Sequence, residues 1–404
     1  MKPLMNLYEE IVSLRNLFQA AKATLARGRR FYGEGSVFKF NLEREVFKLH
    51  EQLVNGKYRH SRYQIFEIRD PKPRTIAAAK FRDRVLHHAV HDVIEPRVDR
   101  IFIHDSYACR KEKGTQKAVN RAQSFLRANE YTVHLDVKSY FQNINHDILK
   151  SFLRRILDDT RTIELLEMII DSTRYLALNG YDNAGIRRIS DVTREDDQLY
   201  LFEDDFTPEK SGGCALPWGI IGRDDQSESN YSVKGLPLGN LTSQFFANLY
   251  LNELDQYVKH QLKARYYLRY MDDMVVFDNS KDSLREREQA IRVFAADKLR
   301  LELHPSGGPS PTRKGLSFLG FRIFPEYRKL RDVSINRFVQ RMNKYTDQYF
   351  SLSHRRSEQF EFLQKIMQST QSFNAHALNG NTYKIRKLLY DRFPIINQYG
   401  LVGM

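Results

Sequence analysis

RYYLRYMDDMVVFDN, residues 265–279, is the stretch of sequence from which the fold can be worked out. Apolar residues alternate on both sides of Asp272 and Asp273, which predicts a hairpin over 265–278 with the two carboxylates at its tip. Adjacent carboxylates repel each other, and the pair becomes favourable where a divalent cation binds. An ordinary Asp-Asp turn explains this stretch equally well when it is taken alone.

A third carboxylate lies upstream, in YTVHLDVKSYF at residues 131–141. β-branched and aromatic residues predict a strand over 131–137 that carries Asp136. We expect this strand to lie beside the hairpin in one sheet, so that Asp136, Asp272 and Asp273 converge. Three carboxylates suit two Mg²⁺ ions, of which one activates an attacking 3′-hydroxyl and the other holds the leaving phosphates. The pattern therefore predicts nucleotidyl transfer.

The composition fits a globular enzyme with a polyanionic partner. The chain has 404 residues, 41% of them hydrophobic, which suits two or three subdomains around a continuous core. Lys and Arg outnumber Asp and Glu by 64 − 50 = 14, a charge that favours nucleic acid as the partner. A basic protein without such a partner is the alternative from charge alone. Two cysteines are too few for a disulfide framework or a zinc knuckle.

Signals for membrane insertion and secretion are missing from the sequence. No run of 18 or more apolar residues occurs, so no transmembrane helix is expected. The N-terminal stretch is amphipathic and lacks the apolar core and the cleavage site of a signal peptide. We therefore expect a cytoplasmic protein with no membrane partner.

Hydrophobic spacing divides the rest of the chain into helices and one strand pair. The helices are predicted within 1–60 and over 82–97, 146–158, 161–177, 242–262 and 281–300, and the strand pair over 62–80. Pro96 is expected to end the first of the helices after residue 60. Thr242 or Ser243 is expected to cap the helix that follows the glycine-rich segment at 235–239.

Two segments differ from the rest in charge. Residues 181–232 hold twelve acids and five bases, with frequent Gly and Ser, which predicts a surface insertion that is partly loop. Residues 331–404 hold eleven bases and five acids, and their spacing predicts a basic helical module. The insertion could bind an accessory protein, a second protomer or RNA, or it could be an inert elaboration.

Two further segments carry residues suited to a nucleotide. GLPLGNLTSQ, residues 235–244, combines glycines, a proline and a helix start, which let the backbone approach a base pair or a triphosphate closely. Lys72 and Arg74 lie on the predicted strand pair, where they could reach a triphosphate, and Arg offers bidentate geometry. Taken alone, the first segment reads more simply as a turn before a helix, and the second as a solvated basic turn.

Seven segments follow one another along the chain in an order that is more specific than any one of them. They are DPKPRTI (70–76), DRVLHHAV (83–90), DSYACRKEKGTQKAV (105–119), HLDVKSYFQNINHDIL (134–149), GLPLGNLTSQFFANLYLNELD (235–255), YLRYMDDMVVF (267–277) and GLSFLGFRIF (315–324). This ordered set resembles the bacterial reverse transcriptases. It is most similar to those of diversity-generating retroelements and the related defence-associated group.

The resemblance implies an α+β fold in the form of a right-hand polymerase. An N-terminal extension and the fingers would occupy residues 1–130. A palm with an antiparallel sheet would occupy 131–325, with the acidic insertion at 181–232, and a basic helical thumb 326–404. The thumb would grip an RNA–DNA hybrid through phosphate and 2′-hydroxyl contacts. The implied substrates are dNTPs.

The resemblance also implies roles for individual residues. Asp136, Asp272 and Asp273 would be catalytic, and Phe141 would be a steric gate against a ribose 2′-hydroxyl. The group that would hold two Mg²⁺ ions, for which Mn²⁺ may substitute, is Asp136, Val137, Asp272 and Asp273. The residues implied at the dNTP are Lys72, Arg74, Tyr140, Phe141, Leu238, Gly239 and Gln244. The residues implied along the template and primer are Arg110, Tyr270, Met271 and Gly320.

The sequence departs from the usual pattern of this family at two points. Many reverse transcriptases have Gln where this chain has Leu238, and a side chain without a polar group cannot check the new base pair by hydrogen bonding. We therefore expect low fidelity. The lysine expected after the hairpin helix is missing from LELHPSGG, residues 301–308, which leaves the general acid for pyrophosphate open between His304, Arg313 and Lys314.

The leading hypothesis is an RNA-directed DNA polymerase that copies a dedicated noncoding RNA into cDNA. No endonuclease, RNase H or maturase DNA-binding module is recognisable in the sequence, so we expect a template that is encoded nearby. Antiviral defence and a diversity-generating retroelement are the competing settings, and the long insertion favours defence. Template-independent or protein-primed DNA synthesis and an inactive RNA-binding protein are further alternatives. Repulsion among the three aspartates is an argument against the inactive protein.

Overall fold

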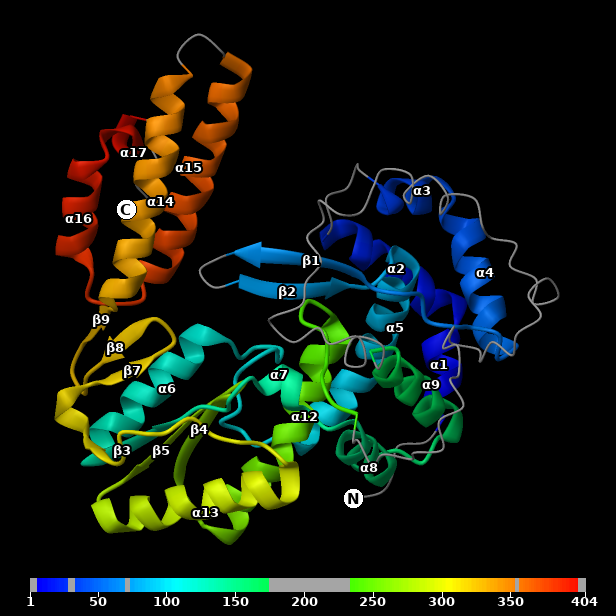
Figure 1. The fold of residues 1–404 in the computed structure, drawn as a ribbon, viewed down its shortest axis with the longest axis horizontal. Helices are drawn as coiled ribbons and strands as arrows, with labels where there is room; N and C mark the ends of the chain where they lie inside the picture. Colours follow the sequence, from blue (N-terminus) through cyan, green and yellow to red (C-terminus); the bar gives the residue numbers. More distant parts are fainter. Residues whose placement is uncertain (1–5, 28–32, 70–72, 174–232, 353–355, 399–404) are drawn as a thin grey trace, which may run out of the picture.

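The computed structural model describes residues 6–27, 33–69, 73–173, 233–352 and 356–398 (Figure 1). The described chain combines helices with antiparallel sheets, which confirms the predicted α+β class. The acidic segment 181–232 and Lys72 lie outside the described residues. None of the helices in the described part is both long enough and apolar enough to span a bilayer.

A four-stranded antiparallel sheet carries the predicted hairpin. Its strands, in spatial order, are β4 (Tyr266–Tyr270), β5 (Asp273–Asp278), β3 (Tyr131–Leu135) and β6 (Ser310–Pro311). Leu135 pairs with Met274 across β3 and β5, and Tyr270 pairs with Asp273 across the hairpin. β3 ends two residues earlier than predicted, so Asp136 follows the strand directly.

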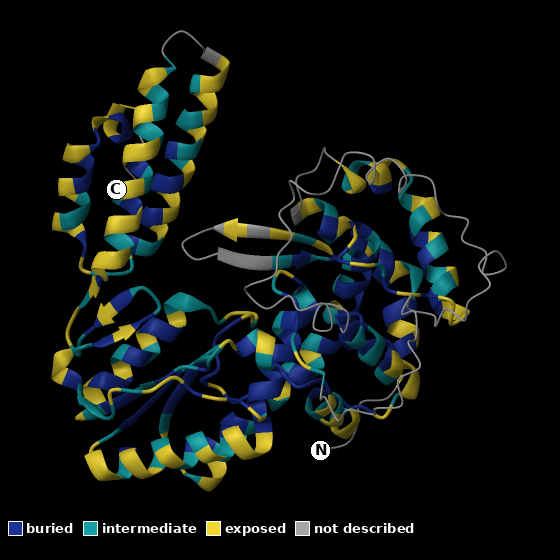
Figure 2. Cartoon of the chain, viewed as in Figure 1, coloured by how far each residue is buried: buried dark blue, intermediate teal, exposed yellow. Residues whose placement is uncertain are grey.

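Both faces of this sheet are buried, which explains why its strands are apolar almost throughout. Met274 and Val276 belong to one hydrophobic core, and Val275 and Phe277 to the other. The helices that pack near the sheet are α12 (Leu241–Gln256), α13 (Lys281–Leu299) and α6 (Thr115–Ala128). Figure 2 shows buried positions gathered around the sheet and exposed positions on the outer side of α13.

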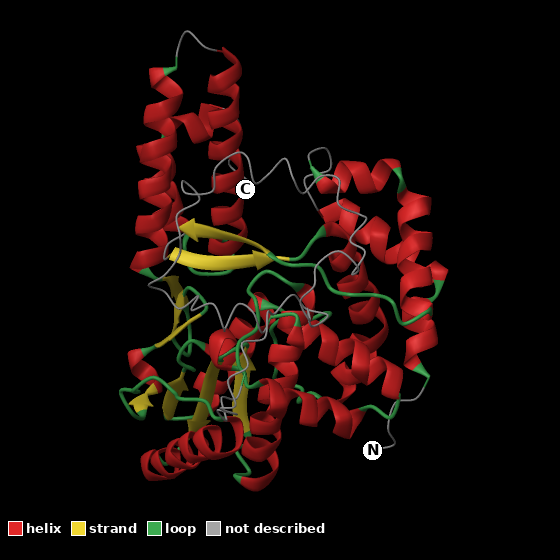
Figure 3. Cartoon of the chain, turned by 45° about the vertical axis from the view of Figure 1, so that its right-hand side comes forward, coloured by secondary structure: helices red, strands yellow, loops and turns green. Residues whose placement is uncertain are grey.

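The N-terminal part is helical, as predicted, and is organised around α5 (Phe81–Val98). Its other elements are α1 (Leu7–Val12), α2 (Leu14–Arg27), α3 (Glu34–Phe40), α4 (Leu42–Val54), β1 (Gln64–Arg69), β2 (Pro73–Ala78) and the short η1 (Asp99–Ile101). Figure 3 shows the β1–β2 ribbon apart from the central sheet.

The prediction that Pro96 ends α5 is wrong, because Pro96 lies inside the last turn of the helix. The helix continues to Val98, and the Asp99 N–H bonds the Glu95 carbonyl to close its last turn. A proline so near the end of a helix removes only one N–H group of the final turns, so the helix tolerates it.

Between β3 and β4, the described residues 136–173 and 233–265 include three shorter helices and α12. The short helices are α7 (Tyr140–Asn143), α8 (His146–Ile156) and α9 (Thr160–Asp171), and both α8 and α9 end before the predicted residues 158 and 177. α12 begins after Asn240 and not at Thr242 or Ser243, which are buried in its first turn. The Asn240 side chain instead bonds the Ala77 carbonyl at 3.1 Å, which ties the start of α12 to β2. A short π-helix, η4 (Tyr257–Gln261), extends α12.

The C-terminal part combines a small sheet with the predicted helical module. Its elements are η5 (Thr312–Lys314), β7 (Leu316–Phe318), β8 (Phe321–Ile323), β9 (Arg328–Leu330), α14 (Asp332–Ser351), α15 (Arg356–Ala377), α16 (Tyr383–Arg392) and α17 (Pro394–Gln398). Phe338 of α14 stacks on Phe373 of α15, with ring centroids 4.1 Å apart. Both rings belong to the core that includes Phe277 of the central sheet, so the module is continuous with it.

Candidate active site

The three predicted aspartates lie at one edge of the central sheet. Asp136 directly follows β3, Asp272 lies in the turn between β4 and β5, and Asp273 is the first residue of β5. Because Leu135 pairs with Met274, the next residue of β3 and the preceding residue of β5 are neighbours, and these are Asp136 and Asp273. Pairing of these two strands therefore brings together the carboxylates of Asp136 and Asp273, which lie 137 residues apart in the sequence.

The negative charges of these aspartates repel one another. Burial, together with the charges of Asp273 and Asp136, raises the pKa of Asp272 to about 6, although a backbone hydrogen bond in the turn lowers it. Burial and the charge of Asp273 likewise raise the pKa of Asp136. The three carboxylates thus raise one another's cost of ionisation, which favours binding of a cation between them.

The donor set fits a hard divalent ion whose shell is completed by other molecules. Among the described residues, no three His, Cys, Asp or Glu side chains gather closely enough to hold an ion alone. Mg²⁺ typically takes only one or two carboxylates from the protein and completes its octahedron with water and substrate phosphates. Asp136, Asp272 and Asp273 supply such carboxylate oxygens and would hold the ions in that way.

Val137 contributes main-chain groups beside Asp136. Its N–H donates to the Asp136 carboxylate, which lowers the pKa of Asp136 and partly offsets burial. Residues 302–304 run antiparallel to this segment, with Lys138 N–H bonded to Glu302 and His304 N–H bonded to the Asp136 carbonyl at 2.8 Å each. The Val137 carbonyl lies outside that ladder, so it could face an ion as predicted.

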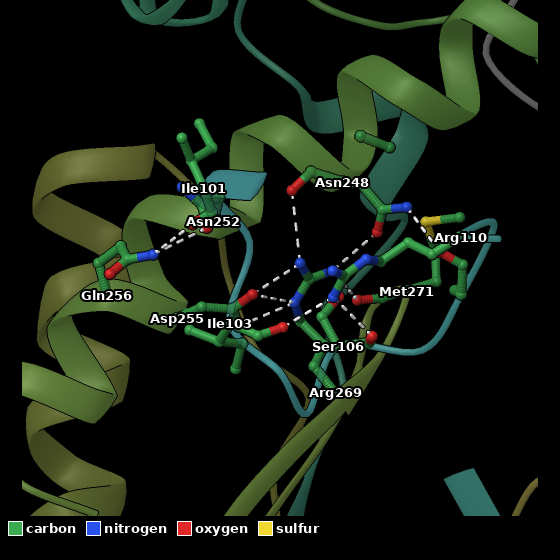
Figure 4. A network of polar contacts seen from close by, with 12 residues as sticks. Ile101, Ile103, Ser106, Arg110, Asn248, Asn252, Asp255, Gln256, Arg269 and Met271 are labelled. Carbon is green, nitrogen blue, oxygen red and sulfur yellow. Dashed lines mark hydrogen bonds and ion pairs between the residues drawn. The ribbon is translucent and has the colours of Figure 1, made fainter. Parts of the chain in front are cut away.

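A buried ion pair supports the turn that carries Asp272 and Asp273 (Figure 4). Arg269 and Asp255 are 0% exposed, and the guanidinium donates to both carboxylate oxygens at 2.7–2.9 Å. The same guanidinium donates to Asn248 at 3.1 Å and to the carbonyl of Met271 at 2.9 Å. Met271 adopts a left-handed backbone with φ 55°, so its carbonyl needs such a partner to hold the turn.

Sequence reasoning missed Arg269 and Asp255. The available signal was a charged residue at each of two otherwise apolar positions, in YYLRYM and in LNELDQY. Burial alone would lower the pKa of Arg269, but Asp255 beside it raises that pKa above its usual value. The guanidinium therefore stays charged inside the protein.

Phe141 and the GLPLG segment are brought together by the backbone. Leu236 N–H donates to the Phe141 carbonyl at 2.8 Å, and Phe141 itself is half-buried. Tyr140 is buried, and its hydroxyl donates to the Ala247 carbonyl of α12. The side chain of Tyr140 thus supports α12, and its predicted contact with a dNTP stays a prediction.

The other residues implied at the dNTP lie around the start of α12. Gly239 has φ 104°, and a Cβ added there would lie 3.2 Å from the Ile76 side chain of β2. Leu238 is half-buried. The side-chain oxygen of Gln244 accepts a hydrogen bond from the Cys109 thiol at 3.4 Å. Arg74 lies opposite Ile68 in the ribbon, while its side chain lies outside the described residues.

The residues implied along the template and primer divide into two groups. Tyr270 and Met271 belong to the aspartate turn, and Gly320, with φ 85°, forms the turn between β7 and β8. Arg110 is different, because its guanidinium is largely buried and bonds Asp99 and the Ile103 carbonyl. In this structure the side chain holds the segment after η1 in place, and its predicted contact with nucleic acid stays a prediction.

Only one of the three candidate general acids lies at the aspartate edge. His304 is bonded to Asp136 through its backbone, and its charge lowers the pKa of Asp136. Arg313 and Lys314 follow β6, which pairs with Tyr131 at the opposite end of β3. Of the three, His304 is therefore the candidate whose position fits.

We expect protons and divalent ions to compete at this site. Because the pKa of Asp272 is raised to about 6, Mg²⁺ binding below pH 6 must displace a proton. The apparent Mg²⁺ affinity should fall about tenfold for each pH unit below 6. Calorimetric titration of Mg²⁺ between pH 5 and pH 8 measures this slope. An affinity that stays constant down to pH 5 would contradict it, and Asp272→Asn should flatten the slope.

Parts of this chain are similar in sequence to known proteins. A family model described as reverse transcriptase (RNA-dependent DNA polymerase) matches residues 198–323, a range that includes Asp272, Asp273 and Gly320. Protein YkfC of Escherichia coli K12 is 23% identical over 79% of this chain and 83% of its own length. The group II intron-encoded protein LtrA of Lactococcus lactis subsp. cremoris is 22% identical over 55% of this chain.

The chain spans 30% of the length of LtrA, so it matches only part of that relative. Among solved structures, a chain of the partial Cas6-RT-Cas1–Cas2 complex is 17% identical, covering 73% of this chain and 43% of that one. Its TM-score of 0.36 is too low to support an argument about shape or function. The matched family model spans residues 198–323, which include Asp272 and Asp273, and supports RNA-directed DNA polymerase activity for this chain.

Proposed function

We propose that this reverse transcriptase copies a dedicated noncoding RNA into cDNA, with Asp136, Asp272 and Asp273 as its catalytic residues. The observation that carries the proposal is the register of β3 and β5, which makes Asp136 and Asp273 neighbours in a site whose charges repel. The ions, when bound, would activate the primer 3′-hydroxyl and stabilise the leaving phosphates. The three carboxylates hold and orient that charge, and the buried Arg269 keeps their turn in place.

The right-hand arrangement is part of the same proposal. The β1–β2 ribbon and N-terminal helices would be the fingers (1–130), the four-stranded sheet the palm (131–325), and α14 to α17 the thumb (326–404). Support comes from the direct link between Asn240 and Ala77, which couples the ribbon to the segment before α12. The excess of bases over acids in residues 331–404 supports contact with the phosphates of an RNA–DNA hybrid.

Phe141 is proposed to exclude ribonucleotides by the bulk of its ring. Phe141→Ala should raise the kcat/KM for an NTP relative to the matching dNTP by at least about tenfold, because it opens space for a 2′-hydroxyl. Single-nucleotide incorporation with both substrates measures the ratio. Tyr140→Phe is the matched control, since it removes only the hydroxyl bonded to Ala247 and should leave the ratio unchanged. Equal discrimination in Phe141→Ala and the wild type would contradict the proposal.

Leu238 is proposed to lower fidelity because it offers no hydrogen bond to the new base pair. Leu238→Gln should reduce the misincorporation frequency by about tenfold, an effect within the range that one added polar contact provides. Sequencing of cDNA made on a defined RNA measures it. Leu238→Met keeps the side chain apolar and should leave the frequency unchanged. A lower error frequency in both variants would mean that packing and not hydrogen bonding decides fidelity.

We propose antiviral defence in the cytoplasm as the biological setting, on the ground of the long acidic insertion at 181–232, which suits an accessory protein or a second protomer. A diversity-generating retroelement is the second candidate, and Leu238 is the observation that favours it, because error-prone copying is what diversification requires. The genes and repeats next to the coding sequence separate the two settings. A nearby template repeat with a variable repeat would mean diversification.

Sequencing of nucleic acid that copurifies with the protein tests the proposed function. The wild type is compared with the double variant Asp272→Ala, Asp273→Ala. We expect the wild type to carry one defined RNA and its complementary DNA, and the variant to carry the RNA alone. DNA without a complementary RNA would favour template-independent or protein-primed synthesis. RNA without DNA in both proteins, even after dNTPs and Mg²⁺ are added, would favour an inactive RNA-binding protein.

A further inference from the structure

His134 lies beside the aspartates and has no role in the function proposed so far. Its Nε2 is 2.9 Å from Oδ1 of Asp273, within hydrogen-bonding distance. A carboxylate can only accept, so Nε2 carries the hydrogen and donates it. His134 stands two residues before Asp136 on β3, and alternate residues of a strand share a face, so His134 and Asp136 flank Asp273 from the same side of the sheet.

The imidazole of His134 is also held from a second direction. Its ring meets the ring of Phe318 edge to face, with centroids 6.1 Å apart and an interplanar angle of 89°. Phe318 is 1% exposed and ends β7, two residues before Gly320. The turn that follows is tightly specified, because Leu319 and Gly320 both have positive φ. The ring is thus fixed between a buried aromatic residue and the carboxylate.

We propose that His134 is a positioning residue for Asp273. Its N–H fixes the rotation of the Asp273 carboxylate by holding Oδ1, so that Oδ2 is presented to a divalent ion. The inference rests on the proposed role of Asp273 as a metal ligand. Metal-binding carboxylates are commonly held by such outer hydrogen bonds, and loss of one typically costs about 10-fold to 100-fold in metal affinity or activity.

The competing explanation is that His134 only fills space between β3 and Phe318. The two explanations differ in what they require of the side chain. Positioning requires an N–H donor at the reach of Nε2, whereas packing requires a flat ring against Phe318. His134→Phe keeps the ring and removes the donor. His134→Gln keeps a donor at similar reach and removes the ring. The two variants therefore separate the explanations.

The experiment measures Mn²⁺ binding directly, by electron paramagnetic resonance on protein carrying a primer–template but no dNTP, at pH 8. Binding needs no turnover, so the readout is independent of activity. We expect His134→Phe to weaken Mn²⁺ binding about 10-fold or more and His134→Gln to stay within about threefold of the wild type. The Mg²⁺ concentration for half-maximal primer extension should shift in parallel, while the dNTP KM at saturating Mg²⁺ should not change.

Three outcomes would overturn the inference. Wild-type binding by His134→Phe would show that the donor is unnecessary. Equal losses in His134→Phe and His134→Gln would show that the ring and its packing matter. A wild type that binds no Mn²⁺ would remove the metal site itself, and with it the proposed function. A wild type that binds Mn²⁺ but copies no RNA would refute only the proposed function, because the binding comparison would still stand.

Discussion

Asp272→Asn will abolish primer extension and at the same time stabilise the metal-free protein. The loss of activity should reach at least about a thousandfold, because the substitution removes a proposed ligand of ions that would stabilise the transition state by several kcal/mol. The gain in stability follows from the raised pKa of Asp272. A group that prefers to be protonated in the folded protein destabilises it when the pH forces it to ionise, and an amide has no such charge.

The size of this stabilisation depends on pH in a defined way. The unfolded carboxyl has a pKa of 3.8, and the folded one a pKa of about 6. The stability that protonation of Asp272 provides is complete below 3.8 and is lost as the pH rises through 6. The difference in melting temperature between Asp272→Asn and the wild type should therefore be largest at pH 8 and vanish near pH 4, when both are measured in EDTA.

Asp282→Asn is the matched control for Asp272→Asn. Asp282 pairs with Arg285 on the surface of α13, and its side chain is 82% exposed. An exposed ion pair of this kind contributes little, so neither activity nor melting temperature should change noticeably. A metal-free Asp272→Asn variant that melts below the wild type at pH 8 would contradict the repulsion argument. Residual activity above about one part in a hundred would contradict the assignment of Asp272 as a ligand.

The elements around the aspartates were predictable because their signals are local. Alternation over 265–278 predicts β4 and β5, and the observed strands agree to within a residue or two. The periodicity of 281–300 likewise predicts α13, and Ser280 caps it. Hydrophobic periodicity of 2 or 3.6 residues is a property of neighbours in the chain, so one sequence suffices to detect it.

The hydrogen-bond partners of individual polar side chains could not be predicted, because the pattern of neighbouring residues does not identify them. Tyr140 looked like a contact for the nucleotide, but its hydroxyl bonds Ala247, 107 residues away. Arg110 looked available to nucleic acid, but it bonds Asp99 inside its own loop. The type of a polar residue says that it needs a partner and does not say which one. His134 escaped notice for the same reason, since its carboxylate partner is 139 residues away.

Removing either partner of the buried ion pair should destabilise the protein strongly. Asp255→Leu leaves the charge of Arg269 without a counter-ion at a position that is 0% exposed. Loss of one partner of such a pair typically costs about 3–5 kcal/mol, and Arg269→Met should fall at the lower end because Asp255 can take up a proton. Urea denaturation followed by circular dichroism measures both variants. The exposed pair Asp282 and Arg285 is the control, and its substitutions should cost less than about 0.5 kcal/mol.

The double variant, Asp255→Leu with Arg269→Met, distinguishes stability from positioning. Apolar residues of similar volume often replace a buried ion pair without loss, so the double variant should recover most of the stability that each single variant loses. It should not recover polymerase activity, because the Met271 carbonyl still lacks the donor that holds the aspartate turn. Full recovery of both would mean that the ion pair only stabilises the fold. Recovery of stability alone would mean that a charge buried behind the sheet is retained for the geometry of Asp272 and Asp273.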